Sequence, residues 1–288
     1  MNKVCSIRFS DLLRLFVLKQ PGADGMRPRL APFIITRDVF CFGLTVAAVV
    51  WLILRGSEQV GYTWHWQQIP RYLVTITDHQ VSPGPLLKGL LVTLEITAMS
   101  LVLAGIIGLV TALLRLSTSA VGRWLARVYL ELIRNTPLLV QIFFLYFAMA
   151  PIFDIGRTAT AVLALSLFEG AYVSEIFRAG ITSIGRGQWE ASYSLGLSPY
   201  QTYRRIILPQ AFRRVLPPLT SQAVSLVKDS ALVSTIAVYD LTMEGRTIVA
   251  ETFLTFEVWL VVAAIYLALT LTLSALANAL ERRYPRVA

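Results

Sequence analysis

Residues 190–210 read EASYSLGLSPYQTYRRIILPQ, a polar segment between long apolar runs. Residues 188–195 (QWEASYSL), which overlap its start, are compatible with a helix. Gly196 then suits the left-handed backbone position that ends many helices, because glycine has no Cβ to clash there. We therefore predict that a short helix ends at Gly196.

The residues after Gly196 predict a second short helix. Ser198 is a favourable N-cap, Pro199 suits the first helical position, and Gln201 completes a capping box. Leu208-Pro209 is predicted to end this helix. The segment is thus expected to form two short helices that meet at an angle at Gly196.

The composition is that of a membrane protein. Of 288 residues, 56% are hydrophobic and 15% are charged, and the mean hydropathy is +0.63. Soluble domains carry roughly 25% charged residues. The net charge of +9 does not indicate nucleic-acid binding, because the arginines flank apolar runs instead of sharing one soluble face.

Six apolar stretches are long enough to cross a bilayer. They lie near residues 38–54, 86–114, 125–150, 158–179, 212–238 and 257–280. The second is free of charge from Ile96 to Leu114 and the sixth from Val258 to Leu280, whereas the fourth and fifth contain charged residues. We therefore expect an all-α polytopic membrane protein with six transmembrane helices.

The distribution of lysine and arginine predicts the orientation, since cytoplasmic loops are enriched in both. These residues concentrate in 1–37, 115–127, 178–214 and 282–288. The alternate connections hold few of them: Arg55, Arg71, Arg157 and Arg246. Both termini and the segment 190–210 are therefore expected in the cytoplasm, where paired short helices would suit the groove of a partner protein.

The spacing of residues in this segment resembles the EAA loop of ABC importer permeases. The matching residues are Glu190, Ala191, Ser192, Gly196, Ile206, Leu208 and Pro209, with Ser192 in place of the second alanine. Further blocks resemble the polar amino acid branch of that family: RNTPLLVQ (134–141), GAYVSEIFRAGI (170–181), GRGQWEA (185–191), LPQAFRRVLPP (208–218) and SLVKDSALVSTIAV (225–238). The resemblance covers about residues 85–281.

The resemblance implies a function and a domain division. The chain would be the permease subunit of an ATP-driven, binding-protein-dependent importer of polar amino acids in the bacterial inner membrane. It implies a cytoplasmic segment (1–37), a first helix with its outer loop (38–84), a five-helix permease domain (85–281) with a coupling loop at about 185–210, and a cytoplasmic tail (282–288).

The resemblance also implies partners. Two ATPase subunits would bind ATP and Mg²⁺ and receive the coupling loop, a solute-binding protein would deliver the amino acid, and a second permease chain, identical or sister, would complete the path. The chain itself has no G-x-x-x-x-G-K-[ST] motif, so it is expected to hold no cofactor and to have no enzymatic activity.

Three charged residues within the predicted spans are candidates for the solute path. Glu169, Lys228 and Asp229 lie near the middle of the fourth and fifth stretches, where a charged side chain normally faces protein or water. Glu169 could favour a cationic amino acid or pair with Lys228. Lys228 and Asp229 point about 100° apart on a helix, so each needs another partner or a hydrated cavity.

Ion pairs at i,i+3 spacing are expected for Glu175 with Arg178 and for Glu131 with Arg134. Among competing classes, an intramembrane enzyme is disfavoured, because His65 and His79 both lie in the outer loop and no H-E-x-x-H motif is present. A channel or secondary transporter is the stronger alternative. Neither of these requires a docking loop for an ATPase.

Overall fold

The computed structural model describes residues 40–48, 51–52, 55–56, 62–77 and 80–283. The chain divides into two compact units, Met1–Thr63 and Trp64–Ala288. In the first unit, residues 40–48 are helical, and the rest of the span predicted at 38–54 lies partly outside the described residues. The remainder of the fold concerns the second unit.

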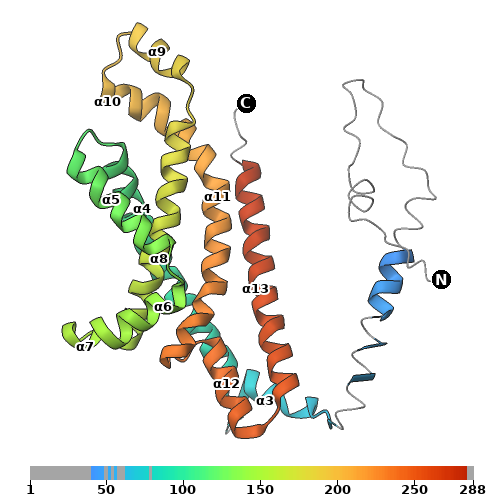
Figure 1. The fold of residues 1–288 in the computed structure, drawn as a ribbon. Coiled ribbons are helices and arrows are strands. Elements are labelled where there is room, and N and C mark those ends of the chain that lie inside the picture. The colour runs from blue at the N-terminus through green and yellow to red at the C-terminus, as the bar shows by residue number, and fades with distance from the viewer. Residues whose placement is uncertain (1–39, 49–50, 53–54, 57–61, 78–79, 284–288) are drawn as a thin grey trace, which may run out of the picture. The chain divides into compact units, whose positions relative to one another are not determined.

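Long helices dominate the second unit (Figure 1). Helices α4 (Pro85–Leu116), α8 (Arg157–Thr182) and α13 (Thr255–Arg283) are apolar enough to cross a membrane. Within the described residues these are the three candidate spans, and a broken helix makes a fourth if its two parts are counted as one span. The all-α membrane class is therefore confirmed at this coarser level.

The stretch predicted as a single span at 125–150 is a broken helix. It consists of α5 (Ala120–Arg134), α6 (Leu138–Phe143), a π-helical turn η2 (Phe144–Met149) and α7 (Ala150–Phe153), and the chain bends by 106° between α5 and α6. Pro137 adopts an extended conformation at the break. The Gln141 amide donates to the Ile133 carbonyl and the Thr136 hydroxyl, both at 2.8 Å. These two bonds give the Ile133 carbonyl and the Thr136 hydroxyl a hydrogen-bond donor at the break.

Helix α11 (Leu208–Asp229) begins earlier than the span predicted at 212–238. It continues into the 3₁₀ helix η4 (Ser230–Ile236). Pro217 and Pro218 lie inside α11. By length α11 could span a bilayer, but it is not among the apolar candidates found in the described part of the chain.

Short elements lie at the end of the bundle opposite to α9. They are η1 (Trp66–Gln68), α3 (Pro70–Leu73), the antiparallel strands β1 (Val74–Thr77) and β2 (Gln80–Pro83), and α12 (Leu241–Thr252). The Asp240 carboxylate caps α12 by accepting from the Met243 N–H at 2.8 Å. The small hairpin was not predicted from the sequence.

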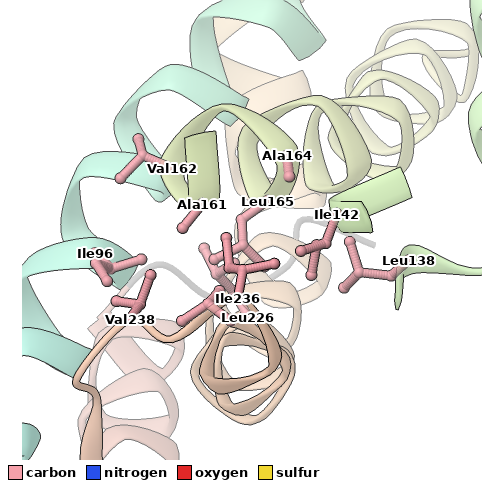
Figure 2. Close-up of a cluster of buried hydrophobic side chains, with 11 residues drawn as sticks. Ile96, Leu138, Ile142, Ala161, Val162, Ala164, Leu165, Leu226, Ile236 and Val238 are labelled. Carbon is pink, nitrogen blue, oxygen red and sulfur yellow. The ribbon is translucent and has the colours of Figure 1, made fainter. Parts of the chain in front are cut away.

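A buried apolar cluster joins the helices of the bundle. Figure 2 shows side chains from α4, α6, α8, α11 and η4 meeting there, among them Ile96, Ile142, Leu165 and Leu226. Helices α4 and α8 make the most extensive contact in the fold, with Ser100 and Ser166 between them. Small residues at such a contact allow close helix packing in membranes.

Candidate functional site

The first half of the segment at 185–210 forms the predicted helix and stop. Helix α9 (Arg186–Ser194) ends at Leu195, and Gly196 has a φ of +74°. The Leu197 N–H donates to the Ser192 carbonyl at 3.2 Å, and the Gly196 N–H donates to Tyr193 at 2.9 Å. This pair of bonds is the Schellman motif. The left-handed glycine predicted at position 196 is therefore confirmed.

The second half begins with the predicted capping box. The Gln201 N–H donates to the Ser198 hydroxyl at 3.4 Å, and the Ser198 N–H donates to the Gln201 side chain at 2.9 Å. Helix α10 (Pro199–Thr202) follows, with Pro199 in its first turn. The turn at Gly196 and this cap together fix how α9 is connected to α10. We call residues 185–210 the two-helix loop.

The predicted end at Leu208-Pro209 is wrong. A π-helical turn, η3 (Tyr203–Ile207), leads from α10 directly into α11, which contains Pro209 in its first turn. In a π-helical turn each backbone N–H donates to the carbonyl five residues earlier, instead of four residues earlier as in an α-helix. Proline lacks an N–H and is tolerated in the first turn of a helix, so the helical path runs on into the bundle.

The residues that match the EAA pattern split between surface and interior. Glu190 and Ala191 are exposed, whereas Ser192 is buried and donates from its hydroxyl to the Gln188 carbonyl at 2.5 Å. Gln188 in turn accepts from the Gln210 amide at 3.1 Å. The serine at this position is thus satisfied by α9 itself.

The residues near the end of the two-helix loop also divide into buried and exposed ones. Ile206 is half-buried, Ile207 is fully buried, and Leu208 and Pro209 are exposed. Trp189 of α9 packs edge-on against Tyr203, with ring centroids 5.0 Å apart. These contacts hold α9 against η3 and give the two-helix loop a fixed shape.

The outer surface of the two-helix loop is unusually apolar. Tyr193, Leu195, Tyr200 and Tyr203 are all exposed, with Leu195 at 77% of its full exposure. Leu197 is half-buried. A rigid surface with exposed aromatic and leucine side chains beside the exposed Glu190 is suited to a protein partner.

Close packing joins the two-helix loop to the bundle. Gly180 of α8 lies against Val215 of α11, and a Cβ at position 180 would overlap Val215 Cγ1. The Arg214 guanidinium donates to the Ser183 hydroxyl at 3.0 Å. Because α8 enters the loop and α11 leaves it, this contact fixes the separation of the loop's two ends.

Glu169 is buried in α8, with 1% of its surface exposed. The Gln222 amide of α11 donates to Glu169 Oε2 at 2.6 Å. Glu169 Oε1 has no hydrogen-bond partner among the residues that the structure describes. The sequence did not identify Gln222 as a neighbour of Glu169, because the two residues lie 53 positions apart.

Lys228 lines a different part of the bundle from Glu169, whereas Asp229 is near enough to Glu169 to interact with it electrostatically. Lys228 is exposed and lines a 230 Å³ cavity between α11 and α13, together with Ser225, Ser274 and Glu281. No ion pair joins Lys228 to Glu169 in the described part of the chain. The structure therefore gives no support to the pairing of Glu169 with Lys228.

Glu175 is a centre of charge where α4, α5 and α8 meet. Its carboxylate binds Arg178, as predicted, at 3.0 Å, and also Arg115 and Arg134. The predicted Glu131–Arg134 pair does not form, because Arg134 reaches Glu175 while Asn135 donates to Glu131 at 2.8 Å. Arg115 and Arg134 lie 60 and 41 positions from Glu175, so sequence spacing could not pair them.

A 760 Å³ cavity opens beside Glu175 on the side of the two-helix loop. Its walls come from α8 and α11 and include Ala179, Ser183, Arg214 and Pro218. Among the described residues there is no group of three or more histidine, cysteine or acidic side chains that could hold a metal ion.

Comparisons with known proteins agree with this geometry. The chain is 40% identical to the glutamine transport system permease protein GlnP of Escherichia coli K12, over 69% of this chain and 92% of that protein. It is 40% identical to the L-cystine transport system permease protein TcyB of Bacillus subtilis, over 72% and 90%. The alignment with this chain covers almost the full length of both relatives.

A solved structure gives the same result. A crystal structure of an amino acid ABC transporter with histidines contains a chain that is 38% identical to this one, with a TM-score of 0.65. The match covers 69% of this chain and 94% of that chain. Residues 104–286 also match the profile of the family described as "Binding-protein-dependent transport system inner membrane component". The chain therefore belongs to the binding-protein-dependent inner membrane component family, the non-catalytic permease subunits of ABC importers.

Proposed function

We propose that this permease subunit carries polar amino acids, and that the two-helix loop couples it to a pair of ATPase subunits. The observation that carries the proposal is the fixed two-helix geometry at the EAA spacing, with Gly196 in a left-handed conformation between α9 and α10. The apolar surface formed by Tyr193, Leu195 and Tyr200 fits the cleft of a partner better than it fits water.

In this proposal the ATPases move the bundle through the ends of the loop. Closure of the partner cleft would push α9 and α10, and the Gly180–Val215 contact would pass that displacement to α8 and α11. Helices α8 and α11 also line the 760 Å³ cavity, so relative movement of the two would change its access. Glu190, exposed on α9, is placed to meet a cationic residue of the partner.

The proposal includes the finer topology. The chain would cross the bacterial inner membrane six times, through one helix within 38–84 and a five-helix domain at 85–281. Residues 1–37, the two-helix loop and the tail at 282–288 would face the cytoplasm. A second permease chain, identical or sister, would complete the path, and a solute-binding protein would dock on the outer side.

The substrate class follows from the relatives and from Glu169. The named transport of glutamine and cystine by the two relatives supports a polar amino acid. Glu169 Oε1, buried and without a partner among the described residues, would attract a cationic group of the solute once the bundle rearranges. Lys228, exposed towards a separate cavity, and Asp229 are retained as path residues of lower priority.

Purification and reconstitution test the proposal. An ATPase subunit should copurify with the full-length chain, and proteoliposomes holding both should accumulate labelled glutamine, cystine or arginine only with ATP and a binding protein present. Uptake driven by an ion gradient without ATP would instead identify a secondary transporter. Passive flux without accumulation would identify a channel.

A further inference from the structure

A basic pocket of 360 Å³ lies where α4, α5 and α8 meet, at the end of the bundle that leads to α9. Three arginines line it: Arg115, Arg127 and Arg134. Glu131, Tyr172 and Glu175 lie among them. The pocket is separate from Glu169 and from the exposed surface of the two-helix loop, and Glu175 is the one lining residue that it shares with the 760 Å³ cavity.

The positive charge of this pocket is only partly neutralised. The Glu175 carboxylate is shared between Arg115, Arg134 and Arg178. Glu131 is a second carboxylate and accepts from the Asn135 amide, so the three lining arginines exceed the two lining carboxylates by one charge. Arg127 is exposed and makes no hydrogen bond or ion pair with any residue in the described ranges. A guanidinium with free donors in such a pocket favours a multivalent oxyanion, and its fork geometry matches phosphate.

An apolar surface adjoins the pocket on α5. The residues Val121, Trp124, Leu125, Val128 and Leu132 are exposed along this helix at spacings of three, one, three and four. Arg127 belongs to the same helix, and Arg115 lies in the last turn of α4. The helix therefore combines an apolar face with basic residues, the pattern of a helix at the membrane interface. Basic pockets between transmembrane helices on the cytoplasmic side bind lipid headgroups.

We propose that the pocket binds the phosphate of an anionic phospholipid, with the acyl chains lying along the apolar face of α5. Arg127 is the main donor to the phosphate, and Arg115 and Arg134 add charge while holding Glu175. The bound lipid links α4, α5 and α8 at the root of the two-helix loop. The inference rests on the proposed function only for placing this lipid in the cytoplasmic leaflet.

Lipid binding to the full-length chain, purified with its copurifying subunits, tests the proposal. Phosphatidylglycerol and phosphatidylcholine are titrated in detergent, and bound lipid is counted by native mass spectrometry. The wild type should retain phosphatidylglycerol in preference to phosphatidylcholine. Arg127→Gln should weaken phosphatidylglycerol binding about fivefold, the effect of one basic residue at an anionic surface, and Arg127→Lys should restore most of it.

Arg123→Gln is the matched control, because Arg123 lies one turn away on α5, outside the pocket, and donates to the Ser117 carbonyl at 2.9 Å. It should leave lipid binding unchanged. Equal loss in Arg123→Gln and Arg127→Gln would overturn the site. Inorganic phosphate competing as well as the lipid would overturn the lipid as the source, and competition by glutamine would indicate a solute site. Lipid binding is measured without transport. The result can therefore be interpreted even if the proposed transport function is wrong.

Discussion

Gly196 is the residue on which the shape of the two-helix loop depends most. Its φ of +74° is costly for any residue with a Cβ, by about 1–2 kcal/mol. A Cβ at this position would meet no atom within 4 Å. The penalty for substitution therefore comes from the backbone conformation alone, and the effect on function can be attributed to the angle between α9 and α10.

We expect Gly196→Val to uncouple ATP hydrolysis from uptake. A strain of about 1–2 kcal/mol corresponds to a roughly 5- to 30-fold loss of the coupled conformation. Uptake in proteoliposomes should fall accordingly while ATP hydrolysis continues. The control is Gly187→Ala, since Gly187 is also open but lies within α9 with no positive φ. Wild-type uptake by the Gly196 variant would contradict the coupling role.

Glu169 allows a second prediction at this scale. Glu169→Gln keeps the shape and can still accept from the Gln222 amide, but it removes the charge. Uptake of arginine should fall about tenfold, and uptake of glutamine less than about twofold, since only the cation loses a charged partner. The exposed Glu251→Gln in α12 serves as the control. Equal losses for both solutes would assign Glu169 a structural role instead.

At the scale of elements, the contact between α8 and α11 controls the root of the two-helix loop. Gly180 permits α11 to approach closely, and Val215, its neighbour, is 4% exposed. Valine in a helix has one strongly preferred rotamer. It therefore cannot readily turn away from a new side chain, and any addition at position 180 must separate the two helices.

Gly180→Ala should destabilise the purified chain by about 1–3 kcal/mol, as expected for overpacking. The melting temperature should fall, and Val215→Ala added to the same chain should restore most of the loss by removing the overlapping methyl groups. Gly105→Ala in α4 is the control, because its Cβ would meet nothing within 4 Å. Thermal unfolding followed by tryptophan fluorescence compares the wild type, Gly180→Ala, Val215→Ala, the double variant and the control. If the stability losses of the two single variants simply add in the double variant, a direct contact between positions 180 and 215 is refuted.

At the scale of the whole molecule, the orientation in the membrane decides whether the two-helix loop can reach an ATPase. Helices α8 and α11 carry the loop at one end of the bundle, and α12 lies at the opposite end (Figure 1). Ser194 is exposed in the loop, and Phe253, just after α12, is 80% exposed. These two positions therefore report the two sides of the membrane.

Cysteine labelling tests the orientation. In a chain with Cys5 and Cys41 replaced by serine, Phe253→Cys should react with a membrane-impermeant thiol reagent in spheroplasts. Ser194→Cys should react only in inside-out vesicles, because the loop is proposed to face the cytoplasm. The opposite pattern would remove the loop from the ATPases and refute the coupling proposal.

The sequence by itself determined the membrane class and the local geometry of the two-helix loop. Composition alone required long apolar helices, and the turn at Gly196 and the cap at Ser198 depend on residues no more than five positions apart. The Glu175–Arg178 pair was predictable for the same reason, because its partners lie one helical turn apart. Interactions of this range need no knowledge of helix packing.

Only the tertiary structure decided the break between α5 and α6, the continuous path through Pro209, and the partners of the buried charges. Arg134 pairs with Glu175 and not with Glu131, which is nearer in the sequence. Glu169 accepts a hydrogen bond from Gln222 and does not pair with Lys228. These partners are separated by 41 and 53 positions. A long charged side chain bonds with the groups that packed helices place near it. Helix packing in a membrane depends on the shapes of whole helix surfaces, so sequence spacing does not reveal these partners.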